Sequence, residues 1–125
     1  MIRALGIDIV ETDRIRDAYH RYGDRFLRRI CSSAETSAMT DRSTEPALFL
    51  AGRFAAKEAV MKALGRFFDR GVALRDIEIL NLPGGKPYVR LTPPLAGKLT
   101  GKRISISITH SGGYALATAI IEEEE

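Results

Sequence analysis

Residues 47–68 constrain the fold of this chain more than any other segment, because they predict one long helix. They are rich in Ala, Leu, Phe, Lys and Glu, and Pro46 just before them suits the first turn of a helix. At about 100° per residue, one apolar stripe of this helix contains Leu50, Phe54, Met61 and Phe68. Because 125 residues is the usual size of one globular domain, we expect a single domain over residues 1–125.

Five other segments have the pattern of β-strands, namely residues 3–11, 76–80, 88–91, 103–109 and 114–121. The segment 81–87, which joins the second and third of these, is dense in Asn, Pro and Gly and predicts a hairpin. The strands outnumber what a helical bundle would need, and the helices gather in the first half of the chain. This order indicates an α+β fold with an antiparallel sheet.

The segment after the first strand predicts an amphipathic helix, which Thr12 or Asp13 can cap. Its apolar side chains at helical spacing are Ile15, Ala18, Tyr19, Tyr22 and Phe26. Gly23 is the position at which this helix can break. Further along, Ser32 or Ser33 followed by Glu35 indicates a second helical start, residues 40–45 a loop, and residues 93–94 the opening of a short helix.

The charge of the chain favours an anionic partner. The formal net charge is +3, but the chain ends in four glutamates, and the rest of it has 19 basic against 12 acidic residues. Such a body suits a nucleic acid, a phosphate-rich cofactor or an acidic protein, and the acidic end is expected to be solvated. No apolar run is long enough to cross a bilayer and no signal layout is present, so we expect a cytoplasmic protein without a membrane partner. Cys31, the single cysteine, is expected to be a packed apolar group.

Two carboxylates interrupt apolar patterns and are candidate functional groups. Asp8 lies in a strand that is otherwise apolar on both faces, where an unpaired charge is costly. Glu58 projects from the edge of the apolar stripe of the long helix, where its ordinary explanation would be an ion pair with Lys62. Two carboxylates on different elements could hold one magnesium ion, although backbone N–H groups or an arginine could equally satisfy Asp8. His110, between a strand and two glycines, is by itself a weak candidate.

Four sequence blocks in order resemble the signature blocks of the holo-acyl-carrier-protein synthases. The blocks are Gly6-Ile7-Asp8-Ile9-Val10-Glu11, Ala51-Gly52-Arg53-Phe54-Ala55-Ala56-Lys57-Glu58-Ala59 continuing to Lys62-Ala63-Leu64-Gly65, Gly85-Lys86-Pro87, and Ile106-Ser107-Ile108-Thr109-His110-Ser111. They run over nearly the whole chain. The resemblance implies a small bacterial phosphopantetheinyl transferase, with a sheet packed on a long central helix, that forms a homotrimer with active sites between subunits.

The resemblance also implies roles for individual residues. Asp8 and Glu58 would bind Mg²⁺ at the pyrophosphate of coenzyme A, and Lys62 would steady the pyrophosphate or the leaving group. The serine proton would pass to a metal-bound water or to Glu58. The remaining contacts to coenzyme A would come from Arg53, Lys57, Gly65, Lys86, Pro87, His110 and Ser111. The chain departs from the family pattern in residues 66–74, where Arg66-Phe67 and Leu74 stand in place of Thr-Gly and tryptophan.

A set of arginines in the first helical region fits an acidic acyl carrier protein. On a continuous helix, spacings of seven, eleven and fourteen residues return close to whole turns and bring together Arg14, Arg21, Arg25 and Arg28. Without the resemblance, such a face would be read as solvated, and a small basic nucleic-acid-binding domain is the competing hypothesis. That hypothesis explains the charge but neither carboxylate, and aromatic residues placed for base stacking are not evident. We therefore expect no nucleic-acid partner.

Overall fold

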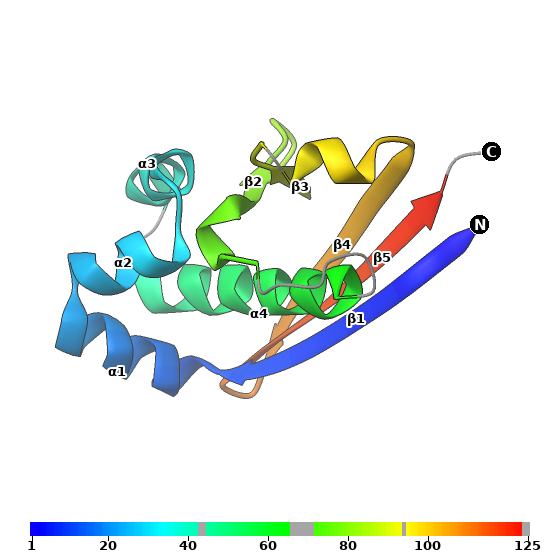
Figure 1. Cartoon of the computed structure of the whole chain (residues 1–125). Coiled ribbons are helices and arrows are strands. Elements are labelled where there is room, and N and C mark those ends of the chain that lie inside the picture. Colours follow the sequence, from blue (N-terminus) through cyan, green and yellow to red (C-terminus); the bar gives the residue numbers. More distant parts are fainter. Residues whose placement is uncertain (43–44, 66–71, 94, 124–125) are drawn as a thin grey trace.

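The computed structural model describes residues 1–42, 45–65, 72–93 and 95–123, and its largest element is a three-stranded antiparallel sheet. The strand order is β1 (Ile2–Glu11), β5 (Tyr114–Glu123) and β4 (Lys102–Ser111). A second antiparallel pair, β2 (Ile77–Asn81) and β3 (Pro87–Leu91), is the predicted hairpin. Figure 1 shows both termini at the same end of the large sheet, and the α+β prediction is confirmed.

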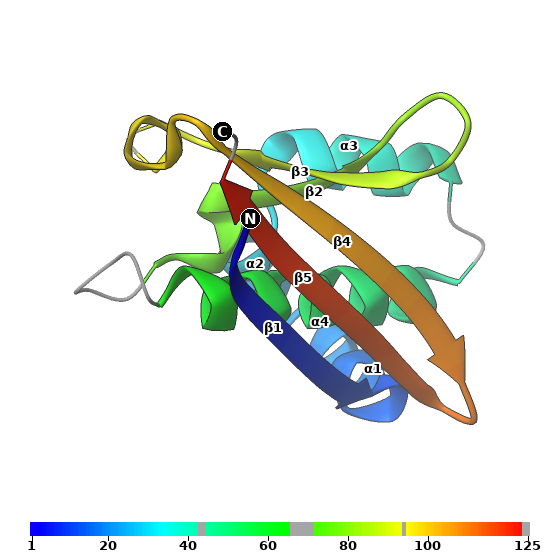
Figure 2. The ribbon, with the colours of Figure 1, turned by 90° about the vertical axis from the view of Figure 1, so that its right-hand side faces the viewer.

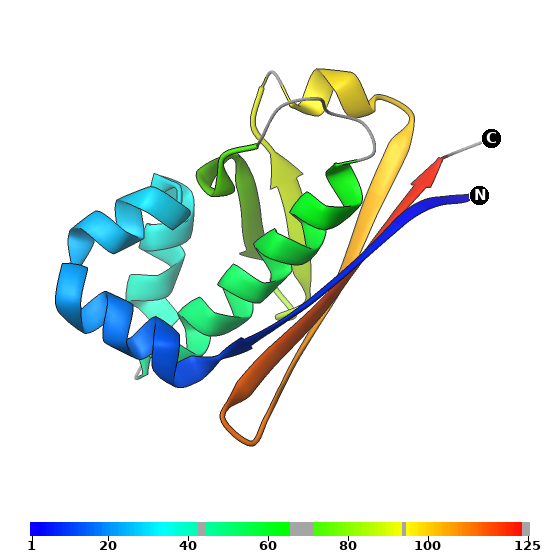
Figure 3. The same cartoon turned by 60° about the horizontal axis from the view of Figure 1, so that its bottom comes forward.

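Four α-helices lie on one side of the large sheet. They are α1 (Thr12–Tyr22), α2 (Asp24–Ile30), α3 (Ser33–Arg42) and α4 (Pro46–Leu64), and two short 3-10 helices are η1 (Leu74–Asp76) and η2 (Ala96–Leu99). Helix α4 runs across the sheet, while α1, α2 and α3 gather around its first half (Figures 1 and 3). The helix expected over residues 47–68 is therefore present to Leu64, and residues 66–68 lie outside the described part of the chain.

Small side chains let α4 approach the sheet closely. The row Ala51, Ala55, Ala59 and Ala63 is fully buried on the helix, and it faces Ala115, Ala117 and Ala119 on β5. A Cβ on Gly6 of β1 would lie only 1.9 Å from the carbonyl oxygen of Ala59, so only glycine fits there. Of the predicted core stripe, Leu50 is fully buried as expected, but Phe54 and Met61 are only half-buried, and the alanine row forms the contact with the sheet.

None of the helices that the structure describes covers the opposite face of the large sheet, as Figure 2 shows. Side chains alternate across a strand, so Asp8 points toward α4 while its neighbours point away from it. Leu5, Ile7 and Ile9 are each more than half exposed on this outer face. The first strand is therefore apolar on both faces, as expected, but only one of them is covered within a single chain.

The first helical region differs from a continuous helix. Gly23 ends α1 with φ 52° and ψ −127°, and α2 begins at the next residue, because this backbone conformation is open to glycine. The start of α3 follows prediction: Ser32 N–H donates to Glu35 Oε1 at 3.0 Å, and Glu35 N–H donates to Ser32 Oγ at 3.3 Å. Helix α3 extends to Arg42, so the first half of the loop predicted over residues 40–45 is helical.

Candidate active site

Asp8 of β1 and Glu58 of α4 line one cleft, which lies between the large sheet, α1 and α4. The cleft has a volume of about 440 Å³. Its lining residues are Asp8, Ile9, Val10, Glu11, Arg14, Ile15, Ala18, Phe54, Glu58 and Tyr114. The close contact of Gly6 with Ala59 sets this arrangement, because it brings the strand two residues before Asp8 against the helix one residue after Glu58.

Lys62 satisfies Asp8 from the next turn of α4. Its Nζ donates to Asp8 Oδ1 at 3.0 Å and to the Ile7 carbonyl oxygen at 2.9 Å. The Asp8 side chain is 18% exposed and the Lys62 side chain 55% exposed, so the pair is open to solvent. The partner of Asp8 in this structure is thus a lysine. The sequence had suggested backbone N–H groups or an arginine as the partners of Asp8 if it did not bind a metal.

Glu58 makes no ion pair with any residue that the structure describes. The expected pair with Lys62 is absent because Lys62 turns to β1 instead. Burial raises the pKa of the Glu58 carboxyl, the nearby charge of Asp8 raises it further, and Lys62 offsets part of the effect. Asp8 and Glu58 therefore repel each other across the cleft, and Lys62 balances part of their charge.

A second group of expected site residues lies on the other flank of α4. His110 Nε2 lies 3.1 Å from the carbonyl oxygen of Leu48. A Cβ on Gly52 would lie 3.1 Å from the His110 ring, so the missing side chain makes room for the imidazole. Asp8 is on β1 and His110 is on β4, and β5 lies between these two strands.

Arg53 belongs to the same flank as His110, and it is buried. Its guanidinium lies 4.1 Å from the centroid of the Phe49 ring and donates to Asn81 Oδ1. Asn81 in turn donates from Nδ2 to the Gly85 carbonyl oxygen at 2.7 Å. Arg53 is thereby connected to the β2–β3 turn, which carries the exposed Lys86 and the half-buried Pro87.

The two flanks do not meet within one chain. Arg53 and Glu58 are five positions apart on α4, which places them about 140° apart around the helix axis. Asp8, Glu58 and Lys62 gather on the β1 side, while Arg53, His110 and the β2–β3 turn gather on the β4 side. One chain therefore assembles two separate groups of the expected residues.

Lys57 was expected to contact coenzyme A, but its side chain serves the fold instead. Its side chain is fully buried, and Nζ donates to Glu35 Oε1 at 2.6 Å, to the Leu74 carbonyl oxygen at 3.0 Å and to the Ile77 carbonyl oxygen at 2.5 Å. An ammonium group has three N–H bonds, and all three are used. Lys57 therefore has no donor left for a phosphate of coenzyme A, and it joins α4 to α3 and β2.

The other expected residues lie on exposed segments. Gly65 follows α4, and its N–H donates to the Met61 carbonyl oxygen at 3.0 Å. Ser111 ends β4 opposite Tyr114. Arg14 lines the cleft and Arg21 is exposed on α1. Arg25 and Arg28 of α2 line a groove together with Phe26 of α2 and Tyr22, the last residue of α1. The break at Gly23 thus divides the four arginines between two helices, and residues 66–71 of the divergent segment lie outside the described residues.

Sequence reasoning missed two residues near these groups. Glu35 was read only as a helix start, yet it also binds Lys57 and accepts the Ile79 N–H at 2.9 Å. Tyr114 was read only as the first residue of a strand, yet it lines the cleft of Asp8 and Glu58. No local signal marks either role: Ser32 indicates only the cap that Glu35 makes, and no periodicity marks Tyr114.

Comparisons with known proteins identify the family of this chain. The family model described as the 4'-phosphopantetheinyl transferase superfamily matches residues 4–119. A holo-[acyl-carrier-protein] synthase of Protochlamydia amoebophila is 46% identical over 120 residues, which cover 96% of this chain and 98% of the relative.

Solved structures of this kind superpose over nearly the whole chain. The synthase of Neisseria meningitidis is 33% identical, with a TM-score of 0.87 and coverage of 98% of this chain and 100% of that one. The synthase of Bacillus anthracis in complex with CoA (3',5'-ADP) is 34% identical, with a TM-score of 0.79 and coverage of 100% and 99%. The chain therefore belongs to the 4'-phosphopantetheinyl transferase superfamily, and within it to the holo-[acyl-carrier-protein] synthases.

Proposed function

We propose that this chain is a magnesium-dependent enzyme that transfers 4'-phosphopantetheine from coenzyme A to a serine hydroxyl of an apo acyl carrier protein. A bond forms between the serine oxygen and phosphorus, the pyrophosphate P–O bond breaks, and adenosine 3',5'-bisphosphate leaves. The observation that carries the proposal is the pair of carboxylates, Asp8 and Glu58, brought from a strand and a helix into one open cleft. The family of the chain supports the same reaction.

The donor set of this cleft fits magnesium. Mg²⁺ is commonly bound by one or two carboxylates, with water and phosphate oxygens filling its octahedron. Among the described residues, no group of three or more His, Cys, Asp and Glu side chains could hold a metal, which disfavours a site built from protein ligands alone. A divalent cation between Asp8 and Glu58 would also relieve the repulsion that helps to raise the Glu58 pKa. When bound, Mg²⁺ supplies charge neutralisation at the pyrophosphate.

The side chains of the cleft have complementary parts in the transfer. Lys62 Nζ, already 3.0 Å from Asp8 Oδ1, is a cation beside the position of the pyrophosphate and can stabilise the leaving bisphosphate. The carrier serine must lose a proton during the attack. Its acceptor would be Glu58 or a water molecule on the cation, and burial together with the charge of Asp8 raises the pKa of the Glu58 carboxyl, which favours proton uptake there.

We further propose that the complete site forms between subunits of a homotrimer. Phosphate and nucleotide contacts from Arg53, His110, Ser111 and the 85–87 turn would come from the other flank of α4, which a second chain can supply. The exposed residues Leu5, Ile7 and Ile9 support an oligomer, because they leave an apolar sheet face uncovered in one chain. A heterologous contact repeated with a rotation of a third of a turn would close into such a ring.

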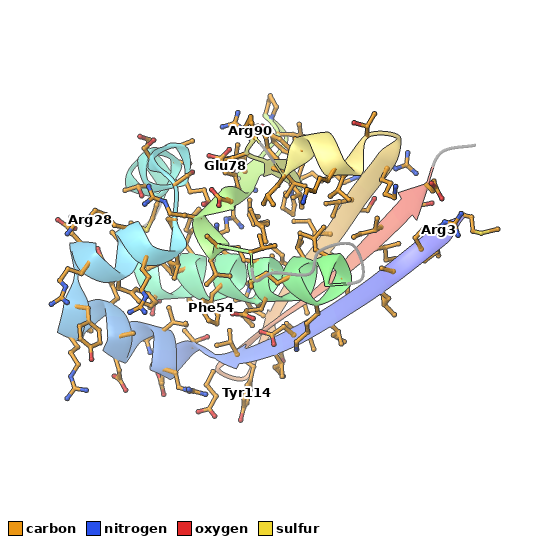
Figure 4. All side chains as sticks on the ribbon, in the orientation of Figure 1. Arg3, Arg28, Phe54, Glu78, Arg90 and Tyr114 are labelled. Carbon is orange, nitrogen blue, oxygen red and sulfur yellow. The ribbon has the colours of Figure 1, made fainter. Side chains whose placement is uncertain are left out.

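The arginines of α1 and α2 support an acidic carrier as the partner. Arg14 lines the cleft itself, and Arg25 and Arg28 border a groove whose floor includes Tyr22 and Phe26. Figure 4 shows Arg28 on the outer side of α2, directed away from the core. This combination suits an acidic helix with an apolar edge, and the charges would act mainly on encounter rate and specificity.

One assay tests the function directly. The protein is incubated with apo carrier protein, coenzyme A and Mg²⁺, and the mass of the carrier is measured. The expected result is a gain of one phosphopantetheine group, which disappears with a chelator and with Glu58→Gln. An unchanged carrier mass under all conditions would contradict the proposal. Retention on nucleic acid at physiological salt would instead favour the competing hypothesis, for which the structure offers no specific support.

No helix among the described residues is long and apolar enough to cross a membrane. The cytoplasmic location expected from the sequence stays a prediction.

A further inference from the structure

The cleft of Asp8 and Glu58 is lined by an aromatic side chain, Tyr114, that has no role in the function proposed above. Tyr114 is the first residue of β5, lines this cleft and is 46% exposed. Figure 4 labels it at the tip of the β4–β5 hairpin, below the part of α4 that carries Phe54. Phe54 lines the same cleft one helical turn before Glu58.

The backbone of Tyr114 is held from both sides. It is paired with Glu11 of β1 and with Ser111 of β4, and the Thr12 N–H donates to the carbonyl oxygen of Gly113 at 2.8 Å. The Tyr114 hydroxyl makes no hydrogen bond to any residue that the structure describes. A rigid hairpin thus presents a half-exposed ring, with its hydroxyl available, beside the two carboxylates.

The rest of the cleft wall is largely apolar. Four lining residues are charged, and the other six are Ile9, Val10, Ile15, Ala18, Phe54 and Tyr114. Coenzyme A has a matching chemical sequence, because its pyrophosphate continues into an arm with two methyl groups and two amides. When the pyrophosphate lies at the carboxylates, the arm begins inside this cleft.

Resting on the proposed function, we infer that Tyr114 binds the pantetheine arm of coenzyme A. Its ring forms an apolar wall for the methyl-bearing part of the arm, with Phe54 on the helix side of the same cleft. Its hydroxyl exchanges a hydrogen bond with an amide of the arm, which orients the phosphorus for attack. Tyr114 is therefore a substrate-positioning residue for the arm, distinct from the groups that bind the nucleotide.

The test compares two ligands that differ in the arm. Binding of coenzyme A and of adenosine 3'-phosphate 5'-diphosphate, which keeps the pyrophosphate and lacks the arm, is measured by calorimetry with Mg²⁺ for the wild type, Tyr114→Phe and Tyr114→Ala. Loss of the ring should weaken coenzyme A binding about tenfold. Loss of the hydroxyl alone should weaken it about threefold. Adenosine 3'-phosphate 5'-diphosphate should bind all three proteins with the same affinity within about twofold.

Other outcomes would overturn the inference. Equal weakening of both ligands would assign Tyr114 to the nucleotide, and unchanged binding of both with a raised KM for the carrier would assign it to the carrier. Because the ring is half-exposed, Tyr114→Ala should fold; if it does not, Tyr114→Phe must still weaken coenzyme A alone. A wild-type protein that binds neither ligand would contradict the proposed function itself, so the two failures are distinguishable.

Discussion

Two neighbouring residues of α4, Lys57 and Glu58, place their charges in opposite surroundings. Lys57 is fully buried, and all its donors have acceptors in α3, η1 and β2. Glu58 faces the open cleft, has no ion-pair partner among the described residues, and has a pKa raised by burial and by Asp8. The comparison shows that a charge in a helix pattern does not by itself indicate function. The satisfied charge of Lys57 joins layers of the fold, whereas the incompletely balanced charge of Glu58 faces the cleft in which we propose that the reaction takes place.

The largest expected effect is the loss of transfer activity when a carboxylate of the cleft is changed. Glu58→Gln and Asp8→Asn should each lower phosphopantetheine transfer by about a hundredfold or more, because each removes a charge that would hold the proposed cation at the pyrophosphate. Circular dichroism should show that both variants fold. Rates are measured from the carrier mass at saturating Mg²⁺, and near-normal turnover in either variant would end the metal assignment.

The next effect is a difference in stability between loss of the buried Lys57 and loss of the exposed Lys62. Lys57→Met should lower the free energy of unfolding by about 3–5 kcal/mol, because it leaves the Glu35 carboxylate buried without its cation. Lys62→Met is the matched control on the other flank, and because that pair is exposed it should change stability by less than about 1 kcal/mol. Urea unfolding measures both. Adding Glu35→Gln to Lys57→Met should recover part of the loss, and equal losses from the two single variants would contradict the distinction.

A third prediction concerns the arginines of α1 that we propose bind the carrier protein. Changing both Arg14 and Arg21 to Glu should raise the KM for the carrier about tenfold and leave the KM for coenzyme A nearly unchanged. The double change should also make the KM for the carrier depend less on salt concentration, because exposed charges are screened over about 8 Å at physiological ionic strength. Arg75→Glu, an exposed charge reversal on η1 and outside α1, is the control. A parallel change in both KM values would remove the arginines from carrier recognition.

The smallest effect is a gain in stability from Glu58→Gln in metal-free buffer. Because the folded pKa of Glu58 lies above its ordinary value of 4.5, its ionised form destabilises the fold. The contribution of the protonated form is complete below pH 4.5 and is lost as pH rises through the folded pKa. The variant should therefore melt about 1–3 °C higher at pH 7 and show no such advantage at pH 4. A lower melting temperature at pH 7 would show that the carboxylate stabilises the metal-free protein.

Most of the fold could be predicted because period-two and helical patterns act locally. The strand at β1, the β2–β3 hairpin and the capping box of Ser32 and Glu35 all follow from neighbouring residues. The buried side of α4 could not be predicted in the same way. Large residues usually form the core stripe, but here close approach to the sheet requires alanine, and Phe54 is left at the cleft.

The site was predictable only in part for a similar reason. Residue types identified Asp8 and Glu58 as unusual, and the structure brings them into one cleft. The pairing of Lys62 with Asp8, and of Lys57 with Glu35, depends on the relative positions of elements distant in the chain. The acidic end shows the same limit: Glu122 pairs with Arg103, and Glu123 pairs with Arg3 and Lys102, so this part of the tail is the last stretch of β5.

The central claim is that both flanks of α4 serve one reaction and that different chains contribute them. Its most direct test mixes two inactive proteins, Glu58→Gln and the double variant His110→Ala with Lys86→Ala, after dissociation and reassembly. If the flanks come from different subunits, random mixing restores about a quarter of the sites and hence about a quarter of the wild-type transfer rate. If a single chain supplies both flanks, the mixture stays as inactive as its components, and that result would contradict the account.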